Sequence, residues 1–228
     1  MDIISLGSGS MLVLASTSPR RGMLLEEARF TFARVKAEVS EELPQGVSPE
    51  WGVQELALRK AQAGLEHWLD LGGDPEDIIL GADTIVVLDH EILGKPRTER
   101  EAEQMLSSLS GREHAVYTGV VLMNGRGRKE SAAIRTEVYF HPLTQDEILT
   151  YILTGEPMDK AGAYGIQGKA SAFVDHYEGS LSNVIGLPME HVRERLNVWG
   201  IEQENITLPE VKDGLSSFEG SPRGTITP

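Results

Sequence analysis

An aspartate, Asp83, lies inside an apolar stretch of this chain, residues 78–88 (IILGADTIVVL). The runs on either side of it, 78–80 and 85–88, are short and rich in β-branched residues, which is typical of strands buried on both faces. A carboxylate in such a place is costly to desolvate unless a cation, a metal ion or a proton-transfer task compensates it. Asp83 is therefore a candidate catalytic or metal-binding residue.

A lysine follows on a rigid corner, Gly94-Lys95-Pro96, shortly after a predicted tight turn over 89–91. The neighbouring glycine and proline restrict the backbone, so Lys95 projects from a fixed point. Two interpretations remain open here. Asp83 and Lys95 either belong to one polar site, or they are a surface carboxylate and a surface lysine of an ordinary β-hairpin.

Two arginines occur where a helix is expected to begin. Residues 11–15 are apolar and predict a buried strand, and Ser18 and Pro19 suit the N-cap and the first position of the next helix. Arg20 and Arg21 then fall in the first turn, where the helix macrodipole disfavours cations. A bound anion at this strand–turn–helix junction is favoured over two solvated surface residues.

A further cation interrupts the apolar face of a long predicted helix, residues 50–71. Apolar residues recur there with helical spacing, and Lys60 is the one charged member of that face. Its side chain either extends along the surface to water or points to a buried anion or carboxylate. The segment before this helix, 38–42, is acidic and contains Glu41, which indicates nothing by itself.

The remaining pattern alternates strands and helices. We expect strands over 30–39, 114–123 and 132–140, and helices starting after Thr98, Thr144 and Pro188. Residues 159–168 (DKAGAYGIQG) are rich in glycine and alanine, which indicates that the backbone approaches something closely. Within this segment, the amide of Gln167 can recognise a hydrogen-bond donor and an acceptor together.

The composition is that of a globular protein and limits its partners. The chain has 228 residues, of which 40% are hydrophobic, so it can bury a core. Its net charge of -14 argues against non-specific binding to nucleic acid or to an anionic membrane, but not against one small anion. There is no cysteine, which excludes disulfides and thiolate catalysis.

The chain is expected to contain one domain. The start lacks the pattern of a signal peptide, and no apolar run approaches the length of a membrane span, so a cytoplasmic protein with no membrane partner is expected. We predict a flexible lead-in over 1–10, an α/β domain over 11–202, and a disordered tail over 203–228, where glycine, serine and proline are frequent.

The unusual residues together suit triphosphate chemistry. Basic side chains offset phosphate charge, and carboxylates hold a divalent ion of the Mg or Mn type through oxygen. The ion and the basic groups then stabilise the charge that develops at phosphorus. The sequence contains neither a P-loop pattern nor a Rossmann glycine pattern, so a phosphate site here would be of another kind.

Several motifs resemble the Maf family of nucleotide pyrophosphatases, also called septum-formation-like proteins. They occur in a consistent order over roughly residues 11–200: LASTSPRR (Leu14–Arg21), LGADTIVVLDHEILGKP (Leu80–Pro96), LSGREHAVYTGV (Leu109–Val120), DKAGAYGIQG and SNVIGLP (Ser182–Pro188). The resemblance implies an elongated α/β fold with a mixed β-sheet flanked by helices. It implies two lobes around a central cleft, similar to the inosine-triphosphate pyrophosphatases.

The resemblance also implies a reaction and roles for individual residues. A nucleoside triphosphate would be cut between its α and β phosphates by a homodimeric, Mg- or Mn-dependent enzyme. Asp83 would be the proton acceptor and, with Glu41, a metal ligand. The phosphates would be held by Ser18, Arg20, Arg21, Lys60 and Lys95.

Three positions bear on the substrate. Family members with arginine after Ser-Pro, threonine after Gly-Ala-Asp and glutamine in Gly-Ile-Gln-Gly resemble the dTTP/UTP branch, and this chain has Arg20, Thr84 and Gln167 there. A glutamine amide can pair with the O4 and N3 edge of uracil or thymine. Modified pyrimidine nucleotides are a further candidate substrate class.

Two alternatives are kept. One is a 7-methyl-GTP pyrophosphatase, although that branch of the family differs at the three positions. The other is a non-enzymatic binding protein in cell-division control, which only the family's name suggests. Such a protein would need a partner surface, and the sequence shows no amphipathic extension to serve as one.

Overall fold

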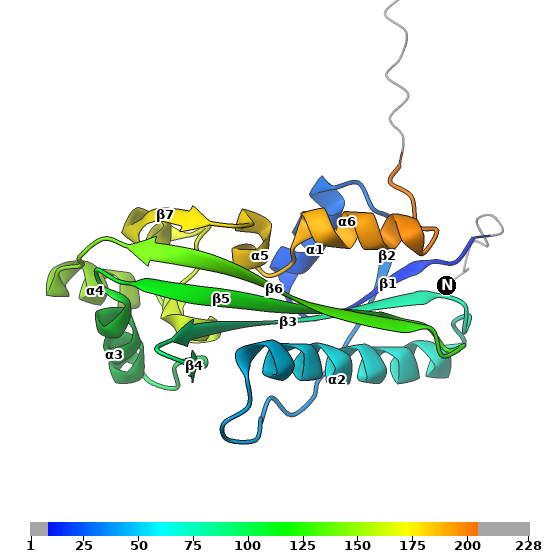
Figure 1. The fold of residues 1–228 in the computed structure, drawn as a ribbon, viewed down its shortest axis with the longest axis horizontal. Helices are drawn as coiled ribbons and strands as arrows, with labels where there is room; N and C mark the ends of the chain where they lie inside the picture. Colours follow the sequence, from blue (N-terminus) through cyan, green and yellow to red (C-terminus); the bar gives the residue numbers. More distant parts are fainter. Residues whose placement is uncertain (1–8, 205–228) are drawn as a thin grey trace, which may run out of the picture.

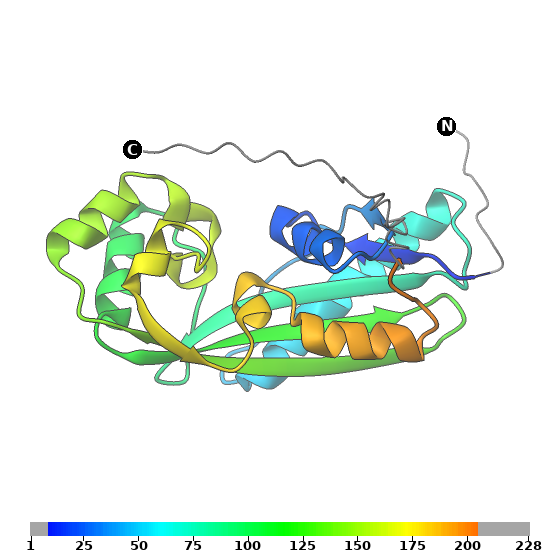
Figure 2. The same cartoon turned by 90° about the horizontal axis from the view of Figure 1, so that it is seen from above.

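The computed structural model describes residues 9–204, which form an elongated α/β protein around one mixed sheet (Figures 1 and 2). The strands follow the order β2-β1-β3-β5-β6-β7, and β4 pairs with β3 outside this path. β1 is parallel to β2 and β3, and the other pairs are antiparallel. The strand bounds are β1 Leu12–Ala15, β2 Phe32–Val35, β3 Ile78–Leu88, β4 Glu91–Leu93, β5 Glu113–Met123, β6 Lys129–Phe140 and β7 Val174–Glu178. The expected α/β fold with a mixed, helix-flanked sheet is confirmed.

Helices lie on both faces of the sheet. The long helix α2 (Pro49–Asp70) runs along one face, and α1 (Pro19–Glu27), α5 (Leu181–Ile185) and α6 (Met189–Val198) lie on the other (Figure 1). At one end of the molecule, α3 (Glu99–Leu109) and α4 (Gln145–Ile152) pack together with three short 3₁₀ helices: Glu156–Asp159, Ala161–Ala163 and Lys169–Phe173. No helix among the described residues has the length and apolar character needed to cross a lipid bilayer.

Helix α2 approaches the backbone of the sheet closely at two glycines. A Cβ atom on Gly81 would lie 2.5 Å from the carbonyl oxygen of Ala57, and one on Gly119 would meet the carbonyl oxygen of Val53. Only glycine permits this approach of helix to sheet. The close packing places Lys60, near the middle of α2, beside the central strand β3.

Two local predictions are corrected. The runs 78–80 and 85–88 are not separate strands, because β5 pairs with β3 continuously from Ile79 to Val87, and Asp83 therefore lies in the middle of one strand. The strand expected over 30–39 spans only Phe32–Val35, because β1 offers four residues for pairing.

The ends of the chain lie mostly outside the described residues. This applies to nearly all of the predicted lead-in over 1–10 and the predicted tail over 203–228. Two residues of that tail are described. The side chain of Gln203 donates a hydrogen bond to the carbonyl of Ala28 at 2.8 Å, and the backbone amide of Glu204 donates to the carbonyl of Arg29 at 3.0 Å. The packed part of the chain thus includes residue 204.

Candidate active site

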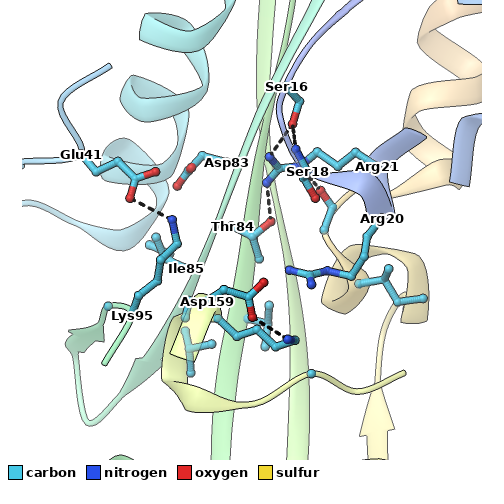
Figure 3. A pocket seen from close by; sticks show the side chains of 18 of the residues that line it. Ser16, Ser18, Arg20, Arg21, Glu41, Asp83, Thr84, Ile85, Lys95 and Asp159 are labelled. Carbon is cyan, nitrogen blue, oxygen red and sulfur yellow. Dashed lines mark hydrogen bonds and ion pairs between the residues drawn. The ribbon is translucent and has the colours of Figure 1, made fainter. Parts of the chain in front are cut away.

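A cleft of about 740 Å³ opens beside the middle of β3 (Figure 3). β1 pairs with residues 78–81 of β3 and β4 pairs with residues 86–88, so among the described strands β5 alone pairs with residues 82–85. The edge of β3 is therefore open where β1 ends. Crevices beyond the carboxyl ends of strands are common ligand sites in open α/β sheets.

All nine residues that the sequence predicts for the site line this one cleft. They come from segments far apart in the sequence: Ser18, Arg20, Arg21, Glu41, Lys60, Asp83, Thr84, Lys95 and Gln167. The interpretation of Asp83 and Lys95 as unrelated surface residues is therefore wrong, because both face the same cavity.

One side of the cleft holds carboxylates and lysines in contact. The ammonium group of Lys60 donates hydrogen bonds to Asp83 and, at 3.0 Å, to Glu41, and Lys95 donates to Glu41 at 3.3 Å. The side chain of Lys60 is 13% exposed, so it points at carboxylates rather than extending to water. Partial burial acts to raise the pKa of Glu41, but Lys60 and Lys95 together hold that pKa below its usual value.

These carboxylates fit a divalent ion. Asp83 is buried, Glu41 is about half-exposed, and both present an oxygen to the same lysine nitrogen. Mg²⁺ is usually held by one or two carboxylates together with substrate phosphates and water, and Mn²⁺ prefers the same oxygen ligands. The donor set therefore suits an ion that arrives with, or is completed by, a phosphorylated ligand.

The opposite side of the cleft holds an arginine among neutral acceptors. Arg21 is buried, and its guanidinium donates to the carbonyl of Gly186 at 2.8 Å, to the hydroxyl of Ser16 at 3.3 Å and to the hydroxyl of Thr84 at 3.2 Å. Burial lowers the pKa of Arg21, and the charge on Asp83 opposes this effect. A buried cation whose hydrogen-bond partners are uncharged is a strong attractor for an anion.

The start of α1 borders the same side. Ser18 is the N-cap and Pro19 the first helical residue, as predicted, and the amide of Ser18 donates to the hydroxyl of Ser16 at 3.1 Å. Arg20 follows in the first turn and lines the cleft (Figure 3). The N–H groups of a helix start and two arginines form a suitable place for phosphate.

Some site residues were not predicted individually. Ser16 and Gly186 hold Arg21, and Lys160 donates to Asp159 at 2.7 Å at the far side of the cleft. These residues lie in LASTSPRR, SNVIGLP and DKAGAYGIQG, the motifs that carry the family resemblance, so the sequence did indicate these segments. It did not indicate which residue of each segment contacts Arg21 or Asp159, because those contacts depend on the fold. Counted together, the cleft is lined by five cationic and five acidic side chains: Arg20, Arg21, Lys60, Lys95 and Lys160, and Glu38, Glu41, Asp83, Glu156 and Asp159.

The equal number of cationic and acidic side chains distinguishes the charge of the cleft from that of the whole chain, which is -14. Cations and carboxylates in equal number suit a ligand that combines phosphate groups with a metal ion. The fold and the cleft thus define an α/β protein with one candidate ligand site of mixed charge. The chain belongs to the Maf-like protein family, whose model matches residues 11–199.

Two proteins named as dTTP/UTP pyrophosphatases are similar to this chain over nearly their whole length. A dTTP/UTP pyrophosphatase of Desulfitobacterium hafniense (strain Y51) is 68% identical over 221 residues, which cover 97% of this chain and 100% of the relative. A dTTP/UTP pyrophosphatase of Geobacillus sp. (strain WCH70) is 50% identical, covering 80% of this chain and 95% of the relative.

Solved structures show a weaker likeness. A HAM1 protein from Coxiella burnetii aligns with a TM-score of 0.40 and 16% identity, covering 72% of this chain and 91% of that chain. A nucleoside-triphosphatase, named as a dITP/XTP pyrophosphatase, from Mycobacterium abscessus aligns with a TM-score of 0.38 and 15% identity, covering 58% and 75%. At these scores the likeness adds nothing to the assignment of the site.

Proposed function

We propose that this protein hydrolyses dTTP and UTP between the α and β phosphates, giving a nucleoside monophosphate and pyrophosphate. The observation that carries the proposal is one cleft in which Asp83 lies between a lysine–carboxylate cluster and the buried guanidinium of Arg21. The names of relatives that are up to 68% identical support the same reaction and the same pair of substrates.

Asp83 is the proposed general base. Its carboxylate takes a proton from a water molecule whose oxygen bonds to the α phosphorus, while the bond from that phosphorus to the bridging oxygen breaks and pyrophosphate leaves. Lys60 holds this carboxylate in place from α2. A divalent ion of the Mg or Mn type, held by Asp83 and Glu41, would supply further neutralisation of the phosphate charge.

The phosphates are proposed to bind on the arginine side and at the cleft mouth. Arg20, Arg21 and Ser18 form the part at the start of α1, and Lys95 projects from the corner after β4. Arg21 uses three of its five N–H groups in the contacts described, so two are available to phosphate oxygens. Bidentate contacts of this type stabilise an anion most strongly.

Substrate selection is proposed to depend on Gln167, with Arg20. Gln167 is exposed on the cleft and can accept from N3–H and donate to O4 of uracil or thymine. The hydroxyl of Thr84, by contrast, is engaged by Arg21 and Thr118. We therefore assign Thr84 to the phosphate side rather than to the base. We also propose that the protein is a homodimer and that it acts on modified pyrimidine nucleotides.

A hydrolysis screen tests it. Purified protein is given dTTP, UTP, CTP, dATP, GTP and 7-methyl-GTP with Mg²⁺, with Mn²⁺ or with chelator, and pyrophosphate is separated from free phosphate. Pyrophosphate with TMP and UMP, in the presence of a metal, is the expected result. Pyrophosphate only from 7-methyl-GTP would overturn the substrate choice. The absence of turnover with all six nucleotides and either metal would overturn the enzymatic proposal in favour of a binding protein.

A further inference from the structure

Two fully buried polar residues lie behind the arginine side of the cleft. Thr118, on β5, and Asn183, on α5, are each 0% exposed and do not line the cavity. They belong to LSGREHAVYTGV and SNVIGLP, two motifs that the proposed chemistry leaves without a direct role. Buried polar side chains usually form hydrogen bonds, and those of Thr118 lead to Arg21, whereas the side-chain amide of Asn183 joins α5 to the sheet.

The direction of every hydrogen bond in this chain of contacts can be assigned. The carbonyl of Asn183 can only accept, so the hydroxyl of Thr118 donates to it, at 2.9 Å. Thr118 has one hydroxyl hydrogen, and therefore the 2.9 Å contact between Thr118 and Thr84 is donated by Thr84. The Thr84 oxygen then accepts from Arg21 at 3.2 Å. The order is Arg21 to Thr84 to Thr118 to the Asn183 carbonyl.

The residue that caps helix α5 contacts Arg21 directly. α5 ends at Ile185, and its C-cap Gly186 has a φ of 130°, which favours glycine. The carbonyl of Gly186 accepts from Arg21 at 2.8 Å. α5 is tied to the sheet because the Asn183 amide donates to the Val116 carbonyl at 3.1 Å and to the Thr136 hydroxyl at 3.0 Å. Arg21 is therefore held at two points that both depend on α5.

This arrangement matters because, within the described residues 9–204, no carboxylate is a hydrogen-bond partner of Arg21 that could orient it. Its three acceptors are one carbonyl and two hydroxyls, and a hydroxyl accepts well only when its own hydrogen is directed elsewhere. Thr118 directs the hydrogen of Thr84 away from Arg21. Successive hydrogen bonds of this kind also polarise and strengthen one another.

We propose that Thr118 is a positioning residue for the reaction: it fixes Thr84 as an acceptor and so aims the guanidinium of Arg21 at the substrate phosphates. The inference rests on the proposed function in one respect, namely that the ligand of Arg21 is the phosphate chain of a nucleoside triphosphate. It assigns Thr84 an indirect role in recognition, through Arg21, and explains why a threonine lies opposite it on β5, where Thr84 and Thr118 are register partners.

Two substitutions separate the hydroxyl from the shape of Thr118. Thr118→Val keeps the volume and removes the hydroxyl, and Thr118→Ser keeps the hydroxyl and removes a buried methyl. We expect Thr118→Val to raise the KM for dTTP about tenfold, with a smaller change in kcat, because the hydrogen bond from the charged Arg21 to Thr84 is weakened. Thr118→Ser should keep a KM near that of the wild type, although its unfolding temperature falls.

A double-mutant cycle distinguishes positioning from loss of structure. If Thr118 acts through Arg21, adding Thr118→Val to Arg21→Lys changes the KM by less than about twofold, because the group that it positions is gone. A general structural effect would instead multiply the KM by the same factor in both backgrounds, and that result would overturn the inference.

A binding measurement keeps this test separate from the test of the enzyme. Isothermal titration calorimetry with inorganic tripolyphosphate, which carries no base, is performed on the wild type and both Thr118 variants at a temperature where all are folded. We expect weaker binding in Thr118→Val alone. Equal affinities for all three proteins, or no binding by the wild type, would overturn the inference. A wild type that binds tripolyphosphate but hydrolyses neither dTTP nor UTP would contradict the proposed function instead.

Discussion

The two sides of the cleft hold their cations in different ways. On one side, Lys60 contacts two carboxylates, Asp83 and Glu41, and Lys95 contacts one of them. On the other side, the hydrogen-bond partners of Arg21 in the part of the chain that the structure describes are all neutral oxygens, from Ser16, Thr84 and Gly186. The lysine charges are thus in direct contact with carboxylates, whereas Arg21 interacts with the charge of Asp83 without a hydrogen bond and keeps donors for an anionic ligand.

This difference separates two tasks. The lysine–carboxylate side has acceptor-only groups that can take a proton or bind a metal ion. The arginine side has donors that are fixed before the ligand arrives, and such preorganisation costs nothing when charge develops in the reaction. Substitutions on the two sides should therefore differ in whether they reduce kcat, affinity or stability.

The largest effect is expected on the carboxylate side, from Asp83→Asn. The amide cannot accept the proton, so kcat should fall about 10³-fold, while a polar group still faces Lys60 and the unfolding temperature stays close to that of the wild type. Steady-state pyrophosphate release and thermal unfolding measure the two quantities. Asp89→Asn, on the exposed turn after β3, is the matched control and should leave turnover unchanged. Turnover of Asp83→Asn close to that of the control would remove the role given to Asp83.

The second-largest effect is expected on the arginine side of the cleft, from Arg21→Lys. Lysine keeps the charge but cannot reach the three acceptors in the same geometry, so buried oxygens lose their donor. We expect binding of tripolyphosphate to weaken by at least tenfold, and the free energy of unfolding to fall by about 1–3 kcal/mol. Calorimetric titration and denaturant unfolding measure these changes. If Arg21→Lys weakened neither, the contrast between the two sides would not hold.

A smaller effect is expected from Lys95→Ala. Lys95 is 54% exposed and its pair with Glu41 is partly solvated, so its removal should raise the KM a few-fold and leave stability within about 1 kcal/mol. A changed KM with an unchanged free energy of unfolding would distinguish Lys95→Ala from Arg21→Lys, for which we expect both ligand binding and stability to change. A loss of stability as large as that of Arg21→Lys would contradict it.

The smallest effect concerns pH. The pKa of Glu41 is held below its usual 4.5 in the folded protein, so its ion pairs stabilise the fold above about pH 4.5, and this contribution is lost as the pH falls through the lowered pKa. The wild type should exceed Glu41→Gln in free energy of unfolding at pH 7 by less than about 1 kcal/mol, because Glu41 is half-exposed. Urea unfolding of both proteins at pH 7 and pH 3.5 should show this difference shrinking. A difference that grew at pH 3.5 would show that ionised Glu41 destabilises the fold.

Much of the site could be predicted because local rules act on short segments. The start of α1 at Ser18 and Pro19 follows from capping preferences, and the amphipathic pattern of α2 made Lys60 stand out as the one charged residue on an apolar face. The extent of β3 was harder. Gly81 and Asp83 are poor strand residues, and the strand continues through them because β5 pairs with it without interruption from Ile79 to Val87.

The sequence by itself therefore determined which residue types are out of place: a carboxylate in an apolar stretch, a lysine on an apolar helix face, and two arginines at a helix start. Local propensity and periodicity suffice for this, because they depend on neighbours within a few residues. Tertiary structure alone decided how these residues meet. It set Lys60 against Asp83 through glycine contacts between α2 and the sheet, and it oriented Arg21 through Thr84, Thr118 and α5. Such contacts join residues from 23 to 165 positions apart, and only the packed fold brings them within hydrogen-bond distance.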